Sequence, residues 1–356
     1  MMDLLEKKLL KEGTVIPAHP LALTEQRGLD EQSQRALTRY YMDAGAGGIA
    51  VGVHTTQFEI RDPTFQLFEK VLELAMEEVE NARLQRPFIK VAGICGPVEQ
   101  AVKEAAFAES IGYSMGLLNM GHLDSYSEEE LLERARAVAD ILPVFGFYLQ
   151  PAVGGRTLSC HFWREFSKIE NVHAIKIAPF DRYKTLEVVR AVCQSPRRDE
   201  IALYTGNDDA IIQDLFSVYR VNVDGDWIEK RIVGGLLGHW AVWTKKAVEL
   251  FENVKAARLK KSIPVEWLMK ATEITDANAV LFDSSNHFKG CIAGINEVLS
   301  RQGLLRGNWC LNPNEKLSPG QSEAISRIYR DYPYMNDDPF IAENLERWRK
   351  ETPCPK

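Results

Sequence analysis

Residues 171–179, Asn-Val-His-Ala-Ile-Lys-Ile-Ala-Pro, form a short apolar run that contains one lysine and ends in proline. An apolar run of this length that is closed by proline predicts a buried β-strand. A buried strand rarely carries a lysine, because removing an ammonium group from water costs free energy. Lys176 therefore either reaches solvent at the end of the strand or presents an amine that reacts.

Strands and helices alternate on both sides of this run. Strands are predicted at residues 14–18, 47–53, 87–93, 113–118, 143–148, 171–179, 201–206 and 231–235. Helices are predicted at 30–44, 63–84, 97–111, 127–142, 158–168, 182–192, 208–216 and 239–254. Strict alternation with apolar strands indicates a parallel sheet covered by helices. Eight units in about 240 residues favour an α/β protein of the (β/α)8 TIM-barrel class over the alternative, a doubly wound open sheet.

The barrel is expected to occupy residues 1–255 and to carry the active site. Asp224-Gly225 between apolar residues predicts a hairpin inserted at 217–230. A C-terminal helical appendage is expected at residues 256–356, with helices at 267–279, 290–301 and 319–331. The remaining residues, 332–356, are expected to form an extended tail with one short helix.

Composition narrows the function classes. The chain has 356 residues, of which 45% are hydrophobic and 26% charged, and its formal net charge is −7. The net charge is negative, whereas proteins that bind nucleic acid usually carry an excess of basic residues, so nucleic acid is not an expected partner. No apolar run is long enough to span a bilayer, and the first residues lack the apolar core of a secretion signal. Six cysteines without a C-x-x-C pair suit reduced thiols of a cytoplasmic protein.

Chemistry in such a barrel is expected at the carboxyl ends of the strands. These ends carry Thr55-Thr56, Tyr148, Lys176 and residues 206–209. A neutral lysine can form an imine with a ketone, a phenol can relay protons, and threonine hydroxyls can hold a carboxylate. Each residue also has an ordinary explanation: threonines favour strands, tyrosines fill the edge of a core, and Asp208 or Asp209 can cap a helix.

Several motifs together resemble the dihydrodipicolinate synthase/N-acetylneuraminate lyase family. Tyr148 lies 28 residues before Lys176, which agrees with the spacing in that family. The motifs are Thr55-Thr56 after Gly52-Val53-His54, Tyr148-Leu149-Gln150-Pro151, Ala174-Ile175-Lys176, Gly206-Asn207-Asp208-Asp209, and the stretch 281–290 after the barrel. The resemblance covers roughly residues 13–330.

The resemblance implies a class I, metal-independent lyase or aldolase that needs no cofactor and acts on a pyruvate-type 2-oxo acid. Lys176 would form the imine and Tyr148 would relay protons. Substrate contacts would come from Thr55, Thr56, Gly206, Asp208 and Arg156, the nearest candidate for the family's substrate-binding arginine. The resemblance also implies a homo-oligomer, either a tetramer or a dimer.

Two departures argue against the lysine-biosynthetic branch. The family's Gly-Thr-Thr-Gly-Glu loop is His54-Thr55-Thr56-Gln57-Phe58 here, and residues 117–120 lack a tyrosine pair. A dehydratase of a deoxy-oxo sugar acid is an alternative that uses the same imine, and a non-catalytic metabolite-binding barrel is another. His54, His122 and His287 can line the mouth of the barrel, but their spacing does not predict a metal site.

Overall fold

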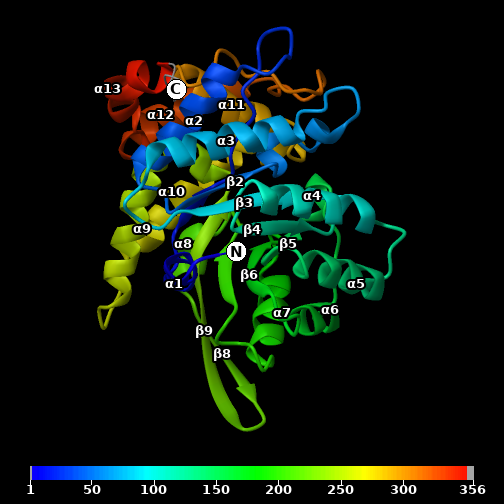
Figure 1. Ribbon diagram of the computed structural model, residues 1–356. Helices are drawn as coiled ribbons and strands as arrows, with labels where there is room; N and C mark the ends of the chain where they lie inside the picture. Colours follow the sequence, from blue (N-terminus) through cyan, green and yellow to red (C-terminus); the bar gives the residue numbers. More distant parts are fainter. Residues whose placement is uncertain (1, 351–356) are drawn as a thin grey trace.

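The computed structural model describes residues 2–350 and confirms the barrel (Figure 1). Eight parallel strands follow one another in the order β1-β9-β7-β6-β5-β4-β3-β2. A bridge between Ala18 and Ala50 joins the two ends of this order and nearly closes the barrel. The strands are β1 (Val15–Pro17), β2 (Gly48–Val51), β3 (Ile89–Ile94), β4 (Met115–Asn119), β5 (Val144–Leu149), β6 (Val172–Ala178), β7 (Ala202–Thr205) and β9 (Asp226–Leu237).

A helix follows each barrel strand and covers its outer face (Figure 1). A capping box of Ser127 and Glu130 begins one of these helices, and Gly45 ends another in the left-handed conformation. These helices are α2 (Glu31–Ala44), α3 (Phe68–Ala82), α4 (Val98–Ser110), α5 (Glu128–Ala139), α6 (Cys160–Phe166), α7 (Arg182–Cys193), α8 (Ile211–Phe216) and α9 (Thr244–Arg258). Short 3-10 helices lie at η1 (His54–Thr56), η2 (Phe58–Arg61), η3 (Pro151–Val153), η4 (His239–Ala241), η5 (Ser284–Asn286) and η6 (Pro333–Met335).

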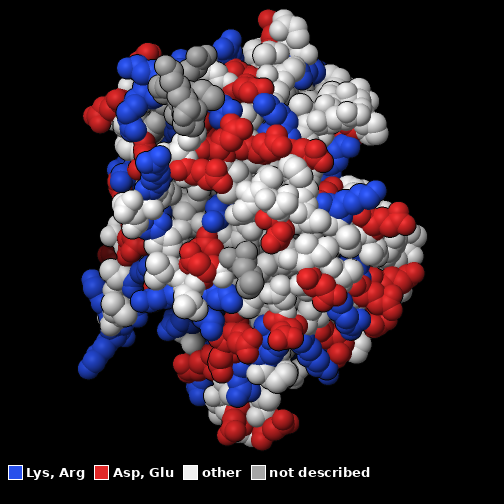
Figure 2. All heavy atoms as spheres, in the orientation of Figure 1, with Lys and Arg blue, Asp and Glu red and all other residues white. Residues whose placement is uncertain are grey.

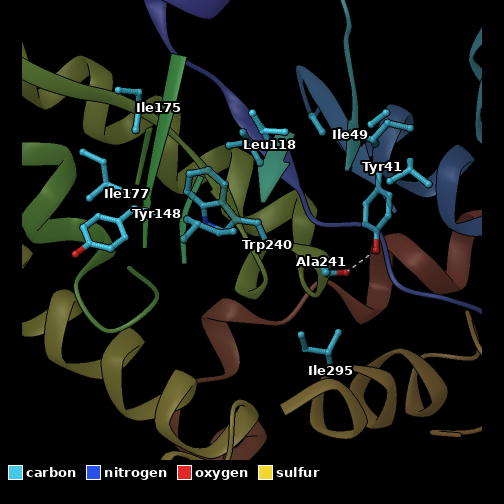
Figure 3. Close-up of a cluster of buried hydrophobic side chains, with 14 of the residues drawn as sticks. Tyr41, Ile49, Leu118, Tyr148, Ile175, Ile177, Trp240, Ala241 and Ile295 are labelled. Carbon is cyan, nitrogen blue, oxygen red and sulfur yellow. Dashed lines mark hydrogen bonds between the residues drawn. The ribbon is translucent and has the colours of Figure 1, made fainter. Parts of the chain in front are cut away.

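The strands separate two apolar layers, because successive side chains of a strand point to opposite faces. On β5, Phe147 and Leu149 belong to the cluster inside the barrel. Tyr148 belongs to the outer cluster between strands and helices, together with Ile175 and Ile177 of β6. Figure 3 shows these three side chains as neighbours in the outer layer. This alternation decides which residues can reach the interior of the barrel.

A helix that was not predicted from the sequence covers the amino-terminal end of the barrel. Helix α1 (Leu4–Glu12) is capped by Asp3, and its Leu10 lies in the interior cluster. The carboxylate of Glu6 accepts a hydrogen bond from Ser114 at 2.8 Å and pairs with Lys90 Nζ at 2.9 Å. Both partners lie near the starts of their strands, so α1 closes this end of the barrel.

The predicted hairpin is confirmed. Strand β8 (Val218–Val223) pairs antiparallel with the first half of β9, and Asp224-Gly225 forms the two-residue turn with positive φ at both positions. The second half of β9 continues into the barrel as its last strand. The hairpin projects beyond the barrel in Figure 1, and acidic and basic side chains are interspersed over the face shown in Figure 2.

Four helices follow the barrel: α10 (Glu266–Leu281), α11 (Cys291–Arg301), α12 (Gln321–Asp331) and α13 (Asp338–Arg349). Most of the expected extended tail is therefore helical, because α13 buries Ile341 and Trp348 against the barrel. The Trp348 ring lies 5.5 Å from that of Tyr40 on α2. The expected domain boundary at residue 255 stays a prediction, and residues 351–356, which include Cys354, lie outside the described part.

The five cysteines within the described residues, Cys95, Cys160, Cys193, Cys291 and Cys310, are all free thiols. In the same part of the chain, every helix is too short or too polar to cross a bilayer.

The packing of α13 gives a stability prediction. Trp348 is 1% exposed and its indole nitrogen donates to Asp43 at 2.6 Å. We expect Trp348→Ala to lower the free energy of unfolding by about 3–5 kcal/mol, through the cavity and the lost hydrogen bond. Denaturant unfolding measures this change. Trp227→Ala is the matched control, since Trp227 is 60% exposed on the hairpin, and equal unfolding midpoints for the two variants would contradict the packing role.

Candidate active site

Lys176 lies inside the barrel and does not escape to solvent. On β6 it has the same orientation as Ala174 and Ala178, which belong to the interior cluster. It is paired with Phe147 of β5 on one side and Tyr204 of β7 on the other. Its side chain is 7% exposed, and Nζ lies 4.3 Å from the centre of the Phe147 ring. Of the two explanations for a lysine in this strand, the structure therefore excludes that Lys176 reaches solvent.

Burial changes the proton affinity of this amine. Among residues 2–350, no carboxylate lies within ion-pair distance of Nζ. Desolvation lowers the pKa of Lys176, although the charge of the nearby Asp208 acts in the opposite direction. Burial likewise raises the pKa of the Asp208 carboxyl group. A larger fraction of Lys176 is therefore neutral, and nucleophilic, near pH 7 than for an exposed lysine.

The amine opens into a small cavity of about 60 Å³ at the carboxyl ends of the strands. Its walls are mainly apolar and come from the strands, from the loops after them and from the helices after the barrel. The lining residues are Ala18, Val53, His54, Thr55, Phe147, Leu149, Gln150, Val153, Lys176, Ala178, Phe180, Gly206, Asp208, Gly238, Phe282, Phe288 and Cys291.

A second cavity adjoins the first and widens toward the surface. It has a volume of about 380 Å³, and we call it the vestibule. His54, Val153 and Phe288 line both cavities, so they form the neck between them. The vestibule also contains polar side chains, among them Glu59, His287, Lys289, Asn312, Asn314 and Glu315. The lysine cavity is thus small and apolar, whereas the space outside it is larger and polar.

Gly206 provides the room that the lysine side chain occupies. A Cβ atom at this position would lie 2.5 Å from Cε of Lys176 and 2.7 Å from Cβ of Ala178. Its backbone N–H donates to the carbonyl of Ile177 at 2.7 Å, which holds β7 close to β6. A larger residue at 206 would therefore require Lys176 or its neighbours to shift.

The two predicted threonines occupy different environments. Thr55 lines the lysine cavity. Thr56 is fully buried behind it, where its hydroxyl accepts from the N–H of Gly52 at 3.0 Å and donates to the carbonyl of His19 at 2.6 Å. Thr56 therefore stabilises the turn that presents Thr55, and only Thr55 has access to the cavity through its side chain.

Tyr148 is not brought to Lys176. Its hydroxyl lies 3.4 Å from the backbone oxygen of Leu158, and its ring packs 5.2 Å from Trp163 of α6 in the outer layer. The reason is the strand register: Phe147, one residue earlier, pairs with Lys176, so Tyr148 points to the opposite face. An irregularity of the pairing between Val144 and Phe145 shifts this register. The predicted proton relay through Tyr148 is therefore not confirmed by these contacts.

Arg156 is also away from both cavities. Its guanidinium donates to the carbonyl oxygens of Leu123 at 2.8 Å and Tyr126 at 2.9 Å, so it fastens the loop after β4. The structure does not bring Arg156 to the lysine, and the predicted arginine contact with substrate is not confirmed.

Asp208 does line the lysine cavity, and its Oδ1 accepts a hydrogen bond from the backbone N–H of His239 at 3.0 Å. Of the three histidines considered, His54 lies at the neck and His287 in the vestibule. Phe282, Phe288 and Cys291 reach the cavity from the chain after the barrel, and none of them was predicted as a site residue. The family resemblance, which includes the stretch 281–290, was the only sign in the sequence that this segment takes part in the site.

The fold and this cavity define a (β/α)8-barrel protein whose site is built around one buried lysine. The model of the dihydrodipicolinate synthetase family matches residues 11–221, and the chain belongs to this family. It is 23% identical to N-acetylneuraminate lyase 2 of Escherichia coli O6:H1 over 317 residues, which is 88% of this chain and 92% of that protein. Over 198 residues, 54% of this chain and 62% of the relative, it is 26% identical to N-acetylneuraminate lyase of E. coli SMS-3-5.

Solved structures show the same fold. Dihydrodipicolinate synthase from Oceanobacillus iheyensis superposes with a TM-score of 0.73 at 17% identity, covering 92% of this chain and 99% of that one. CdNal from Clostridium difficile, solved in complex with mannosamine, gives a TM-score of 0.69 at 18% identity, covering 90% of this chain and 99% of that one. Family membership and the curated relatives support an enzyme of the lyase type.

The buried amine gives a prediction about stability and pH. A lysine whose pKa is lower in the folded than in the unfolded state costs stability, fully at pH values below the folded pKa and not at all above the unfolded pKa. Burial moves the pKa of Lys176 from 10.5 to about 8. We expect Lys176→Met to raise the free energy of unfolding at pH 7 by roughly 1–3 kcal/mol, and this gain to shrink as the pH approaches 10.

Denaturant unfolding at pH 7, 8.5 and 10 measures this gain. Lys260→Met, at an exposed lysine between α9 and α10, is the matched control and should show little change at any pH. A Lys176 variant that is less stable than the wild type, or a gain that does not vary with pH, would contradict a desolvated amine.

Proposed function

We propose that the protein is a class I, metal-independent lyase or aldolase in which Lys176 forms an imine with a 2-oxo acid of the pyruvate type. The observation that carries the proposal is the buried amine itself, which lies without an ionic partner among the described residues in a cavity at the carboxyl end of the barrel. The contact with the Phe147 ring and the nearby charge of Asp208 offset only part of the desolvation of this lysine, whose pKa stays lowered. A reactive role explains why the position is a lysine and why Gly206 leaves space for it.

The proposed reaction begins when the neutral amine attacks the C2 carbonyl carbon of the acid. The resulting carbinolamine loses its oxygen as water and becomes an imine, which draws electrons from the bonds at C3. The hydroxyl of Thr55, which donates to the carbonyl of His19 at 3.3 Å, is the neutral donor that would turn to the substrate carboxylate. A cavity of about 60 Å³ holds a small acid unit, so the rest of a longer substrate would extend into the vestibule.

A dehydratase of a deoxy-oxo sugar acid is the second candidate, and the polar vestibule favours it alongside a lyase. Side chains such as Glu59, Asn312 and Asn314 offer both donors and acceptors to substrate hydroxyls. The two activities share the imine and differ in the bond that breaks next: a carbon–carbon bond in the lyase, or a carbon–oxygen bond in the dehydratase. Product analysis separates them. A non-catalytic barrel that only binds a metabolite would not require a desolvated amine.

We also propose that the protein is a homo-oligomer, a tetramer or a dimer, and acts in the cytoplasm. Family membership is the support for the oligomer, and the reduced thiols of the described residues suit the compartment. Light scattering coupled to size-exclusion chromatography measures the assembly.

Borohydride trapping tests the imine. Incubating the protein with pyruvate and sodium borohydride should reduce the imine to a stable secondary amine on Lys176, located by peptide mass spectrometry. Lys176→Met should give no adduct while it remains folded. If pyruvate and a panel of longer 2-oxo acids all leave Lys176 unmodified in the wild-type protein, the proposed imine mechanism fails.

Gly206→Ala tests the geometry of the lysine. The added methyl group would collide with Cε of Lys176, so we expect the trapping rate to fall by about tenfold or more, equivalent to at least ~1.4 kcal/mol. Gly28→Ala is the matched control, because the nearest atom to its added Cβ is 3.6 Å away. Equal trapping rates in the two variants would show that Gly206 does not set the position of the amine.

A further inference from the structure

Imine chemistry requires a group that takes up and returns protons next to the lysine, and Tyr148 does not reach it. Removing the hydroxyl of the carbinolamine as water needs a proton donor, and forming or using the enamine needs a proton acceptor at the substrate. Apart from Lys176, the titratable side chains that line the cavity are His54, Asp208 and Cys291. These three side chains are therefore the candidates for the group that transfers protons.

Asp208 is the best placed of the three. Its side chain is 8% exposed and lines the same small cavity as the amine. Oδ1 is held by the backbone N–H of His239, and no side chain among the described residues donates a hydrogen bond to either carboxylate oxygen. Its backbone is also fixed, because Asn278 of α10 donates to the carbonyl of Asp208 at 2.6 Å. The carboxyl group is thus held in position but remains available on the side of the cavity.

The other two groups fit the role less well. Burial raises the pKa of the Cys291 thiol well above its usual value, so the thiol keeps its proton. Burial and the charge of Lys176 lower the pKa of His54 to about 4, so its ring stays neutral and is a weak base. His54 also lies at the neck toward the vestibule, where it contacts Phe58 ring to ring at 5.9 Å.

We propose that Asp208 is the catalytic residue that exchanges protons with Lys176 and with the substrate, in place of a phenol on strand β5. This inference rests on the proposed function and assigns a residue to the proton transfers of that same site. It gives Asp208 a part in the chemistry, beyond the contact with substrate hydroxyls that the resemblance implied.

The apolar walls of the cavity support this pairing. In such surroundings the charges of an ion pair are costly to desolvate, so the ion pair of Lys176 and Asp208 loses part of its advantage over the neutral pair. The lowered pKa of Lys176 and the raised pKa of Asp208 have this same cause, burial. The neutral pair is the state that the reaction needs at its start: a nucleophile and, next to it, an acid.

Every proton that Asp208 gives up in the proposed cycle is returned to it before the cycle ends. Lys176 Nζ attacks C2, the amine proton moves to the former carbonyl oxygen, and Asp208 gives its own proton to that oxygen so that water leaves and the iminium forms. The Asp208 carboxylate then removes a proton from C3 of pyruvate, and the C3–H electron pair forms the enamine. Returning the proton to C3 and adding water to C2 regenerates pyruvate and the amine, with no oxidant or reductant consumed.

Exchange of the C3 protons of pyruvate for deuterium in D₂O, followed by NMR, measures the step assigned to Asp208. We expect Asp208→Asn to slow the exchange by about 100-fold or more, in the range typical for losing a general base. The asparagine oxygen can still accept the hydrogen bond from His239. Tyr148→Phe should exchange within about threefold of the wild type, because its hydroxyl faces the outer layer. Slow exchange in Tyr148→Phe together with normal exchange in Asp208→Asn would overturn the inference.

Borohydride trapping of the same samples separates the possible failures. No adduct in the wild type would remove the proposed function and this inference with it. An adduct in the wild type with unchanged exchange in Asp208→Asn would remove this inference alone. Asp208→Glu, which keeps the carboxylate on a longer side chain, should retain more exchange than Asp208→Asn. If both variants are equally slow while thermal unfolding shows intact folding, a proton-transfer role for the carboxylate is contradicted.

Discussion

The desolvation of one ammonium group is the constraint on which the site depends. An amine placed inside a barrel loses its water, and the free energy lost is recovered only through a counter-charge or through loss of the proton. Here Phe147, not a carboxylate, lies nearest among the described contacts of Nζ. The lysine side chain also needs space, which the absence of a Cβ atom at Gly206 provides. The apolar walls, the glycine and the missing ion pair thus act together to place the amine where burial lowers its pKa.

Much of the fold could be predicted from the sequence, because a (β/α)8 barrel repeats one local pattern. Each strand has its own apolar run, and each helix has local start and stop signals such as Ser127 with Glu130 and the glycine at 45. Lys176 could be predicted for the same reason, since a charge inside an apolar run is visible without any knowledge of distant residues. Helix α1 was missed because its contacts, through Glu6 to Lys90 and Ser114, are far away in the sequence.

The orientation of Tyr148 could not be predicted from its spacing to Lys176. Adjacent strand residues face opposite sides, and one irregularity in the pairing, between Val144 and Phe145, brings Phe147 and not Tyr148 opposite Lys176. A spacing that agrees with a family therefore places a residue on the right strand but not on the right face. The contribution of Phe282, Phe288 and Cys291 was likewise hidden, because a chain segment that packs over the mouth of a barrel shows no periodic signal for doing so.

The charge of the substrate sets a further condition on the site. A 2-oxo acid brings a carboxylate, and an anion next to Lys176 would favour the protonated amine and so oppose attack on the carbonyl. An arginine would neutralise that carboxylate, but the candidate, Arg156, is engaged with the carbonyls of Leu123 and Tyr126. The donors left in the lysine cavity are neutral groups such as the hydroxyl of Thr55. Asp208 then has a second effect: as a carboxylic acid it adds no negative charge, and once it has given up its proton its charge stabilises the iminium that forms beside it. In the proposed cycle the carboxyl group is thus neutral in the step that uses the neutral amine, and negative when the nitrogen becomes positive.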